Sequence, residues 1–321
     1  MQNSPNRRNG ERRNDEHRNS ERRNSEQRNR DQREVRTKRK KRSRIGDVLS
    51  SVLMLAALAV FLYSGYTLYG YYRDYKQGTD EYKGLSVYVE NDKANEQEEQ
   101  DALEQGNQQE MTEPETTVIE ENGKQVNVPV MDNPVNFDEL KKVNEDIVGW
   151  LKVRAVDISY PVVQAEDNEY YLHRTFEKTE NFAGCLFMNC GNKADLTDQN
   201  TIIYGHNMKN GSMFGKLKDF KKEETFDKSE YFWIYTPDRI YQYQIFSAMT
   251  VEKTGLTYQT FFTESEFDEL INRAFENSVV DNSDQKVENG DRIMTLSTCT
   301  GDDATRFVIM GKLVQIFAVR K

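Results

Sequence analysis

The chain has 321 residues, which is room for one or two domains of ordinary size. Charged residues make up 31% of it and hydrophobic residues 36%, which excludes a protein packed around apolar cores over its whole length. The charge is unevenly divided: residues 1–44 hold 17 Lys and Arg against 7 Asp and Glu, whereas residues 45–321 hold 27 against 47. This asymmetry indicates that the two parts occupy different compartments or meet different partners.

The first 44 residues repeat a loose Glu-Arg-Arg-Asn theme and contain almost no apolar side chain. We expect residues 1–44 to form a disordered basic tail, because such a segment has too little apolar surface to bury. The tail ends in the basic run Lys38–Arg44. Taken alone, that run is typical of a nucleic-acid-binding arm. The segment that follows argues against this interpretation, and we expect no nucleic-acid partner.

Residues 45–72 have the composition of a membrane anchor. No charged residue occurs from Val48 to Tyr69, and as a helix this stretch spans about 33 Å, enough for a hydrocarbon core of roughly 30 Å. Basic residues precede the stretch, whereas tyrosines and acidic sequence follow it. The positive-inside rule therefore predicts a single-pass protein of the cell membrane, with a cytoplasmic N-terminus, its basic tail against the anionic inner leaflet, and an extracellular remainder. A cleavable signal peptide is the alternative, but its small-residue motif Ala57-Leu58-Ala59 lies inside the apolar run.

Residues 73–135 are rich in Glu, Gln, Asn and Asp and poor in core-forming residues. We expect an acidic stalk, partly helical at best, which holds the C-terminal part away from the membrane. A folded domain is predicted over residues 136–321. It begins with a helix near residues 137–149, because Asn136 and Glu139 form a helix-start signal ahead of apolar residues at helical spacing.

Beyond Trp150, short runs rich in Val, Ile, Tyr and Phe alternate with turn residues. A helix at 263–277 interrupts them, with a capping-box pattern at Thr263 and Glu266. The pattern predicts a mainly β domain, either a sandwich or a barrel. The expected strands are Ala155–Val163, Gly184–Asn189, Asn200–Tyr204, Phe232–Thr236, Ile240–Ala248, Asp291–Ser297 and Arg306–Phe317.

Three cysteines are present, and none belongs to a Cys-x-x-Cys or zinc-type spacing. Cys185 and Cys190 lie in one strand-like run, too far apart along an extended strand for a disulfide. We expect both to be small buried residues. Cys299 remains as the thiol whose role needs explaining.

Cys299 ends one predicted strand, and Arg306 begins the next after the turn-prone Gly301-Asp302-Asp303. If these strands form a hairpin, the thiol and the guanidinium face the same bound carbonyl. Upstream, the strand Asn200–Tyr204 leads into Gly205 and His206, where the glycine permits a sharp turn that brings the histidine out at a strand end.

These three side chains have the chemistry of acyl transfer through a thioester. An imidazolium and an arginine near Cys299 stabilise its thiolate. His206 can protonate a leaving amine and later deprotonate an attacking one. Arg306 is a poor base, but its fixed donors suit the negative oxygen of a tetrahedral intermediate.

The residues around this constellation resemble the sortase family. Thr295-Leu296-Ser297-Thr298-Cys299 is similar to the family signature Thr-Leu-x-Thr-Cys, and Ile203-Tyr204-Gly205-His206-Asn207 resembles its histidine segment. The Leu-Ser-Thr-Cys form, the two predicted helices and the segment Asn168–Leu172 resemble class B members. The resemblance covers roughly residues 136–321, but neither the tail nor the stalk.

The resemblance implies a closed eight-stranded β-barrel with flanking helices, and no metal or other cofactor. It implies cleavage of a C-terminal sorting motif, often of the Asn-Pro-x-Thr type, in a secreted protein. The acyl group then passes from Cys299 to an amino group of a cell-wall precursor or of a pilin. By a looser match, the peptide groove is lined by Asn168, Thr254, Tyr258 and Ser297. Thr300 departs from relatives that carry an acidic residue after the cysteine, which weakens any transfer of their substrate preference.

Two other functions compete with this one: a single-pass receptor or binding ectodomain in which Cys299 is inert, and a cysteine peptidase that only hydrolyses. Several residues also have ordinary structural interpretations that involve no catalysis. His206 alone resembles a satisfied turn histidine, although its context is stronger than that of His173. Arg306 alone is typical of a salt bridge at a strand edge. Asp302 and Asp303 are more typical of a solvated turn than of a cation site.

Overall fold

A computed structural model describes residues 8–89, 115–121, 123–281 and 284–321. The chain divides into two compact units, Met1–Tyr72 and Arg73–Lys321. Helix α1 (Arg8–Leu85) makes up the described part of the first unit and contributes its last turns to the second. As predicted, one helical stretch in the described chain is long and apolar enough to cross a membrane; it lies within Asp47–Tyr88 and has a mean hydropathy of 2.1.

The basic tail differs from the prediction, because it is helical from Arg8 onward. Arg, Lys, Glu and Gln are strong helix formers even where nothing is buried. Pairs such as Lys38 and Glu34, 3.9 Å apart and four residues apart in sequence, add a little helix stability. The low apolar content therefore excludes a packed core in this segment, but it does not exclude a helix.

The predicted domain boundary at residue 136 is also wrong, because described parts of the expected stalk belong to the second unit. The last turns of α1 pack on that unit: Leu85 is buried, and the Tyr82 hydroxyl donates to the carbonyl of Gly184 at 2.6 Å. Strands β1 (Thr116–Glu121) and β2 (Lys124–Met131) form an antiparallel hairpin. Residues 90–114 of the predicted stalk lie outside the described residues.

An ion-pair cluster and a strand pairing hold this hairpin to the barrel. Glu121 at the end of β1 contacts both Arg239 and Arg292, the latter at 2.8 Å. β2 runs parallel to the end of the last strand, where Val130 pairs with Ala318. Mutual neutralisation makes burial of these charges tolerable.

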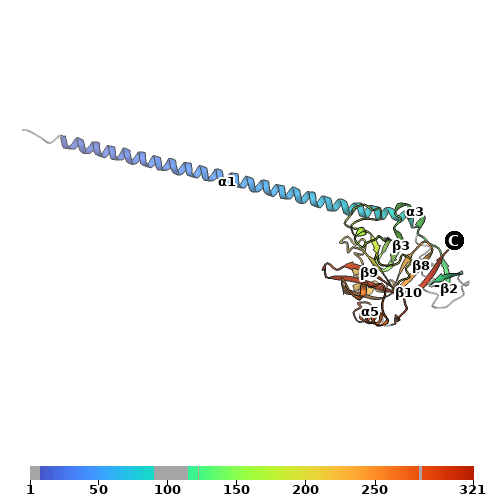
Figure 1. Cartoon of the computed structure of the whole chain (residues 1–321). Coiled ribbons are helices and arrows are strands. Elements are labelled where there is room, and N and C mark those ends of the chain that lie inside the picture. The colour runs from blue at the N-terminus through green and yellow to red at the C-terminus, as the bar shows by residue number, and fades with distance from the viewer. Residues whose placement is uncertain (1–7, 90–114, 122, 282–283) are drawn as a thin grey trace, which may run out of the picture. The chain divides into compact units, whose positions relative to one another are not determined.

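Eight strands close into the barrel implied by the resemblance, in the order β10-β8-β7-β3-β4-β5-β6-β9, with β9 pairing back onto β10. Figure 1 labels β3, β8, β9 and β10 of this barrel. Seven of the eight overlap the runs expected from the sequence. In chain order they are β3 (Ile147–Val153), β4 (Ile158–Val163), β5 (Leu186–Met188), β6 (Asn200–Tyr204), β7 (Tyr231–Tyr235), β8 (Arg239–Glu252), β9 (Ile293–Cys299) and β10 (Thr305–Val319).

The strand that sequence analysis missed is β3. The helix expected near residues 137–149 stops early, as α3 (Phe137–Val143), and Ile147 already begins β3. The cause is Asn144, an extended C-cap residue whose buried amide donates to the Tyr171 hydroxyl and to the Phe176 carbonyl, each at 2.8 Å. These bonds hold the chain in a turn that helical spacing alone does not reveal.

The remaining helices lie around the barrel. α5 (Glu264–Glu276) has the predicted capping box at Thr263 and Glu266, and its Phe267, Leu270 and Ile271 pack in one cluster with residues of β8, β9 and β10. A separate core fills the barrel and is lined by side chains from all eight strands. The short helices are α4 (Glu223–Phe226), η1 (Ser86–Tyr88), η2 (Arg154–Val156), η3 (Tyr170–Leu172), η4 (Leu217–Lys221) and η5 (Leu256–Tyr258).

Candidate active site

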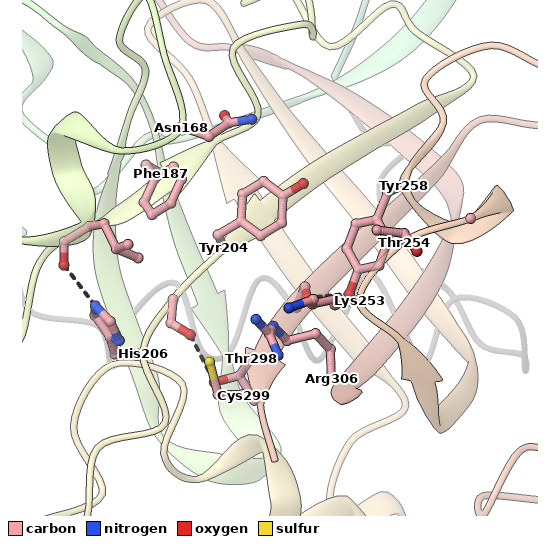
Figure 2. A pocket seen from close by; sticks show the side chains of 14 residues that line it. Asn168, Phe187, Tyr204, His206, Lys253, Thr254, Tyr258, Thr298, Cys299 and Arg306 are labelled. Atoms are coloured by element: carbon pink, nitrogen blue, oxygen red, sulfur yellow. Dashed lines mark hydrogen bonds between the residues drawn. The ribbon is translucent and has the colours of Figure 1, made fainter. Parts of the chain in front are cut away.

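Three neighbouring strands bring the chemistry-bearing residues together. β9 and β10 form the expected antiparallel hairpin, in which Cys299 and Arg306 are direct partners. β6 runs parallel to β9, with Tyr204 paired to Ser297. His206 and Cys299 each lie two residues beyond that pair and therefore emerge at the same end of the barrel. Figure 2 shows Cys299 between His206 on one side and Arg306 on the other.

Hydrogen bonds continue beyond the β6–β9 ladder and tie the histidine segment to the cysteine strand. The Gly205 amide donates to the Ser297 carbonyl at 3.1 Å, and the Thr298 hydroxyl donates to the Gly205 carbonyl at 2.8 Å. One residue further on, the Asn207 amide group donates to the Cys299 carbonyl at 2.8 Å. The backbones on both sides of His206 are thus fixed relative to Cys299.

Gly205 is needed for close packing and not for an unusual backbone angle, since it is not among the glycines with positive φ. A Cβ atom at this position would lie 2.4 Å from Leu186 Cδ2 and 2.7 Å from Phe214 Cδ2. Gly205 is therefore needed, as expected, but for close packing against Leu186 and Phe214 and not for a sharp turn. Only glycine lets the histidine segment lie against the core at this point.

The orientation of the His206 ring is set by a backbone carbonyl. Nε2 lies 2.7 Å from the oxygen of Leu172, and because a carbonyl only accepts, Nε2 must carry the proton and leave Nδ1 as the exchangeable site. Burial holds the pKa of His206 below its ordinary value; the bond to Leu172 raises the pKa and nearby His173 lowers it. The rings of His173 and His206 are stacked, with centroids 6.0 Å apart.

The carbonyl that receives this bond lies in a firmly held segment. The preceding carbonyl, of Tyr171, accepts from the Cys185 amide at 3.0 Å, and the following one, of His173, accepts from the Asn181 amide at 2.9 Å. Three successive carbonyls thus have defined donors, one of which is the imidazole. The carbonyl that orients His206 is therefore itself held in place by the hydrogen bonds of its two neighbours.

Arg306 is oriented by the turn that precedes it. Its Nη1 donates to the carbonyls of Asp303 at 3.1 Å and Thr305 at 2.8 Å. Among the described residues no protein acceptor engages Nη2 or Nε. A guanidinium has five N–H donors in a rigid plane, so two of them fix its direction while others face the pocket. Asp302 stabilises the same turn by accepting from the Ala304 amide at 2.9 Å.

A pocket of about 520 Å³ surrounds Cys299, and the seven sequence-predicted site residues all line it. Ser297 is buried in its floor and hydrogen-bonds the Tyr258 hydroxyl at 2.9 Å. Asn168 accepts from the Cys190 amide at 2.8 Å, and Thr254 lies in the loop after β8. Whether these four residues bind a peptide stays a prediction. In the described chain no group of three His, Cys, Asp or Glu side chains is placed to hold a metal ion.

The pocket also contains residues that sequence reasoning missed. Tyr204 stacks on Tyr258 with ring centroids 6.1 Å apart and contacts Phe187 on its other side. Leu172 and Lys253 also line the pocket. The position of Tyr204, two residues before His206, was a usable signal; nothing in the sequence distinguishes Lys253 from other surface lysines.

The other two cysteines are free thiols. Cys185 is buried, as expected, and burial raises its pKa to about 12. Cys190 is exposed, so the expectation that it is a buried apolar residue is wrong. The reason is that β5 ends at Met188, which places Cys190 in the loop beyond the strand.

Comparison with known proteins agrees with this architecture. The family model for the sortase domain matches residues 151–314. The chain is 37% identical over 180 residues to sortase B of Listeria monocytogenes, an alignment that covers 55% of this chain and 73% of that protein.

Solved structures of sortase B are similar to the fold as well. A Staphylococcus aureus sortase B–substrate complex is 33% identical, with a TM-score of 0.52 over 56% of this chain and 84% of that one. The sortase B from B. anthracis in complex with AAEK1 is 29% identical, with a TM-score of 0.57 over 76% of this chain and 99% of that one. With its closed barrel and its cysteine and histidine segments, the chain belongs to the sortase family, as a class B member, and is a cysteine transpeptidase.

Proposed function

We propose that Cys299 is the nucleophile of this transpeptidase, that His206 is its general acid and base, and that Arg306 stabilises the oxyanion. One observation carries the assignment: three side chains from three adjacent strands meet in one open pocket (Figure 2). A cysteine, an imidazole with a free Nδ1 and a guanidinium with free donors are the parts that thioester chemistry needs.

In the acylation step the Cys299 thiolate attacks the carbonyl carbon of the scissile peptide bond, and the thiol proton resides on His206 Nδ1. The carbonyl oxygen becomes negative and is met by the free N–H groups of Arg306. When the C–N bond breaks, Nδ1 gives its proton to the departing amine. The products are a thioester on Cys299 and the amine of the cleaved C-terminal fragment.

In the transfer step a second amine attacks the thioester carbonyl and His206 Nδ1 removes a proton from it. The C–S bond then breaks, the thiolate leaves, and a new amide bond has formed. Because Nε2 stays bonded to Leu172 throughout, one ring nitrogen carries both proton transfers. No oxidant, cofactor or metal takes part in this sequence.

We further propose that the acyl donor is a C-terminal sorting motif of a secreted protein and that the acceptor is an amino group of a cell-wall precursor or a pilin. The solved relative from S. aureus is a sortase B–substrate complex, which supports a peptide in the corresponding groove. The apolar stretch of α1 supports a membrane anchor, and the basic residues before it favour a cytoplasmic N-terminus with the barrel outside the cell.

Mass spectrometry tests the assignment directly. The protein incubated with an Asn-Pro-x-Thr-type peptide is expected to gain the mass of the acyl fragment, and Cys299→Ala is expected to gain nothing. Cys190→Ala is the matched control, since it removes an exposed thiol outside the pocket, and it should acylate like the unaltered protein. Equal behaviour of the protein and its Cys299→Ala variant would refute the nucleophile and favour a binding ectodomain.

Adding an amine separates transfer from hydrolysis. A transpeptidase is expected to release a ligated peptide in the presence of a glycine-based or lysine-like amine and only slowly to release free acid. If free acid is the sole product with each amine offered, the protein acts as a peptidase under these conditions and the proposed transfer step fails.

A further inference from the structure

The pocket around Cys299 carries a charge opposite to that of the chain that builds it. Two of its lining residues, Lys253 and Arg306, are cations, and no Asp or Glu is among the described residues that line it. By contrast, residues 45–321 hold 47 Asp and Glu against 27 Lys and Arg. Two cations in the pocket of an otherwise acidic protein indicate that the bound ligand is negatively charged.

The reaction itself accounts for only one of the two cations. Arg306 pairs with Cys299 in the strand register and is placed to meet the oxyanion. On its other side Arg306 pairs with Val251 of β8, and Lys253 follows two residues later. Residues two apart on a strand share a face, and the Lys253 amide extends the ladder by donating to the Ala304 carbonyl at 3.0 Å.

Lys253 is therefore on the same face as Cys299 but two strands away. Two strand spacings of roughly 4.8 Å and two residues along the strand, about 6.6 Å, put the two Cα atoms about 12 Å apart, or roughly three to four residues of extended peptide. Figure 2 shows Lys253 near Thr254 and Tyr258, on the Arg306 side of the pocket. A lysine at that backbone distance is suited to a side chain of the bound peptide and not to the carbonyl under attack.

We propose that Lys253 makes the enzyme selective for sorting peptides that carry an acidic side chain, either at the variable position of the motif or just upstream of the motif. This rests on the proposed function, since it concerns the peptide that acylates Cys299. The chemical class of the substrate is then an acidic sorting peptide, recognised by an ion pair inside the pocket.

The existing partner of Lys253 does not prevent this role. Its ammonium lies 3.2 Å from the Asp303 carboxylate, but the Asp303 side chain is 93% exposed and that of Lys253 is 47% exposed. Ion pairs between exposed groups contribute little free energy because water screens them. Asp303 can thus hold the lysine in place when the pocket is empty, and a peptide carboxylate that is partly shielded by the pocket wall competes well against it.

Rates of acyl-enzyme formation test the proposal. Otherwise identical peptides carry Glu, Gln or Lys at the variable position, or at the residue just before the motif. The unaltered protein is expected to favour Glu over Gln about fivefold in kcat/KM at one of these positions, the size of a single favourable ion pair. Lys253→Gln should abolish the preference, and Lys253→Glu should reverse it in favour of the Lys peptide.

Two further variants sharpen the design. Lys228→Glu makes the same change in net charge at a position outside the pocket lining and should leave the preference unchanged. Asp303→Asn removes the competing carboxylate and should increase the preference. High salt should reduce it in the unaltered protein, because the pocket is open to solvent ions.

The outcomes separate this proposal from the proposed function. Acylation by all peptides at equal rates would overturn the selectivity of Lys253 while leaving the transpeptidase mechanism standing. A preference that appears only in the transfer step would place the lysine on the acceptor and also overturn it. Failure of Cys299 to be acylated by any peptide would instead count against the proposed function.

Discussion

The pocket has two walls that are built in different ways. The strand-borne wall presents His206, Cys299 and Arg306 at or just beyond strand ends, where continuous backbone ladders set their spacing. The loop-borne wall consists of the segment after β8, from Lys253 to Tyr258, and lines the same pocket on the side of Arg306 (Figure 2). It is held by separate hydrogen bonds and not by a continuous strand ladder; among them are the bond that the buried Asn200 amide donates to the Thr257 carbonyl at 3.1 Å and the bond between the Tyr258 and Ser297 hydroxyls at 2.9 Å.

This difference assigns separate tasks to the two walls. Groups that must be aligned closely for bond making lie on the ladder, which resists displacement because moving one residue breaks several hydrogen bonds. Groups that distinguish one peptide from another lie on the loop, where substitution disturbs little else. Changes on the strand-borne wall should therefore lower kcat, and changes on the loop-borne wall should mainly alter KM.

The largest effect is expected from Arg306→Lys. A lysine keeps the positive charge but loses the planar fork that two turn carbonyls orient. We expect kcat to fall about 10²- to 10³-fold, as for loss of one oxyanion donor, with an unchanged thermal midpoint. Arg273→Lys is the matched control, since that arginine pairs with Glu269 on the exposed face of α5. Steady-state kinetics of both variants test this, and a loss below tenfold would argue against an oxyanion role.

The second largest effect is expected from Gly205→Ala, because the added methyl group crowds the contact between the histidine segment and the core. The added methyl would lie 2.4 Å from Leu186 Cδ2, and overpacking of this kind costs about 1–3 kcal/mol of unfolding free energy. We expect a lower thermal midpoint and a more than tenfold loss of kcat as the imidazole shifts. Gly84→Ala is the control, because its Cβ meets no atom within 4 Å. Full activity in Gly205→Ala would show that the histidine segment is more adaptable than its packing indicates.

The two walls also differ in how well the positions of their residues can be predicted from the sequence. Cys299 and Arg306 were placed correctly because turn residues between two apolar runs specify a hairpin, and a hairpin fixes its own register. The hydrogen-bond acceptor for His206 is the backbone carbonyl of residue 172. Any residue at that position supplies a carbonyl, so no pattern of side chains predicts this bond. Lys253 acquires its position only through the pairing of β8 with β10, a contact between distant segments.

The same limit explains the misplaced domain boundary. Tyr75, Tyr82 and Leu85 lie among polar residues; the two tyrosines pack on Phe182 and Tyr160, and Leu85 is buried in the cluster that contains Phe137 and Tyr171. A composition average over residues 73–135 therefore indicates a stalk, although three side chains at helical spacing are enough to dock these turns. Local patterns predict elements, whereas docking depends on surfaces that form only when the barrel closes.

A smaller effect should appear in the pH dependence of stability. Burial keeps the pKa of His206 below its ordinary value, so between the unfolded pKa of about 6.5 and the lower folded pKa the unfolded chain binds the extra proton. The unfolding free energy should therefore fall as the pH drops below about 6.5 and stop falling below the folded pKa. Urea midpoints of the protein and of His206→Gln, taken from pH 8 to pH 5, should diverge over this range. A constant gap between the two would show that burial does not lower this pKa.

The smallest effect is expected from Tyr258→Phe, which probes the loop-borne wall directly. The change removes the hydroxyl bonded to Ser297 at 2.9 Å but keeps the ring stacked on Tyr204. This bond within the protein contributes about 1 kcal/mol to stability; without it the phenol ring is held less firmly in the pocket wall, and we expect KM to rise a few-fold while kcat stays nearly constant. Tyr231→Phe, on β7 outside the pocket lining, should change neither parameter. A fall in kcat with constant KM would instead mean that the loop-borne wall helps to align the reacting groups, and the division between the two walls would no longer hold.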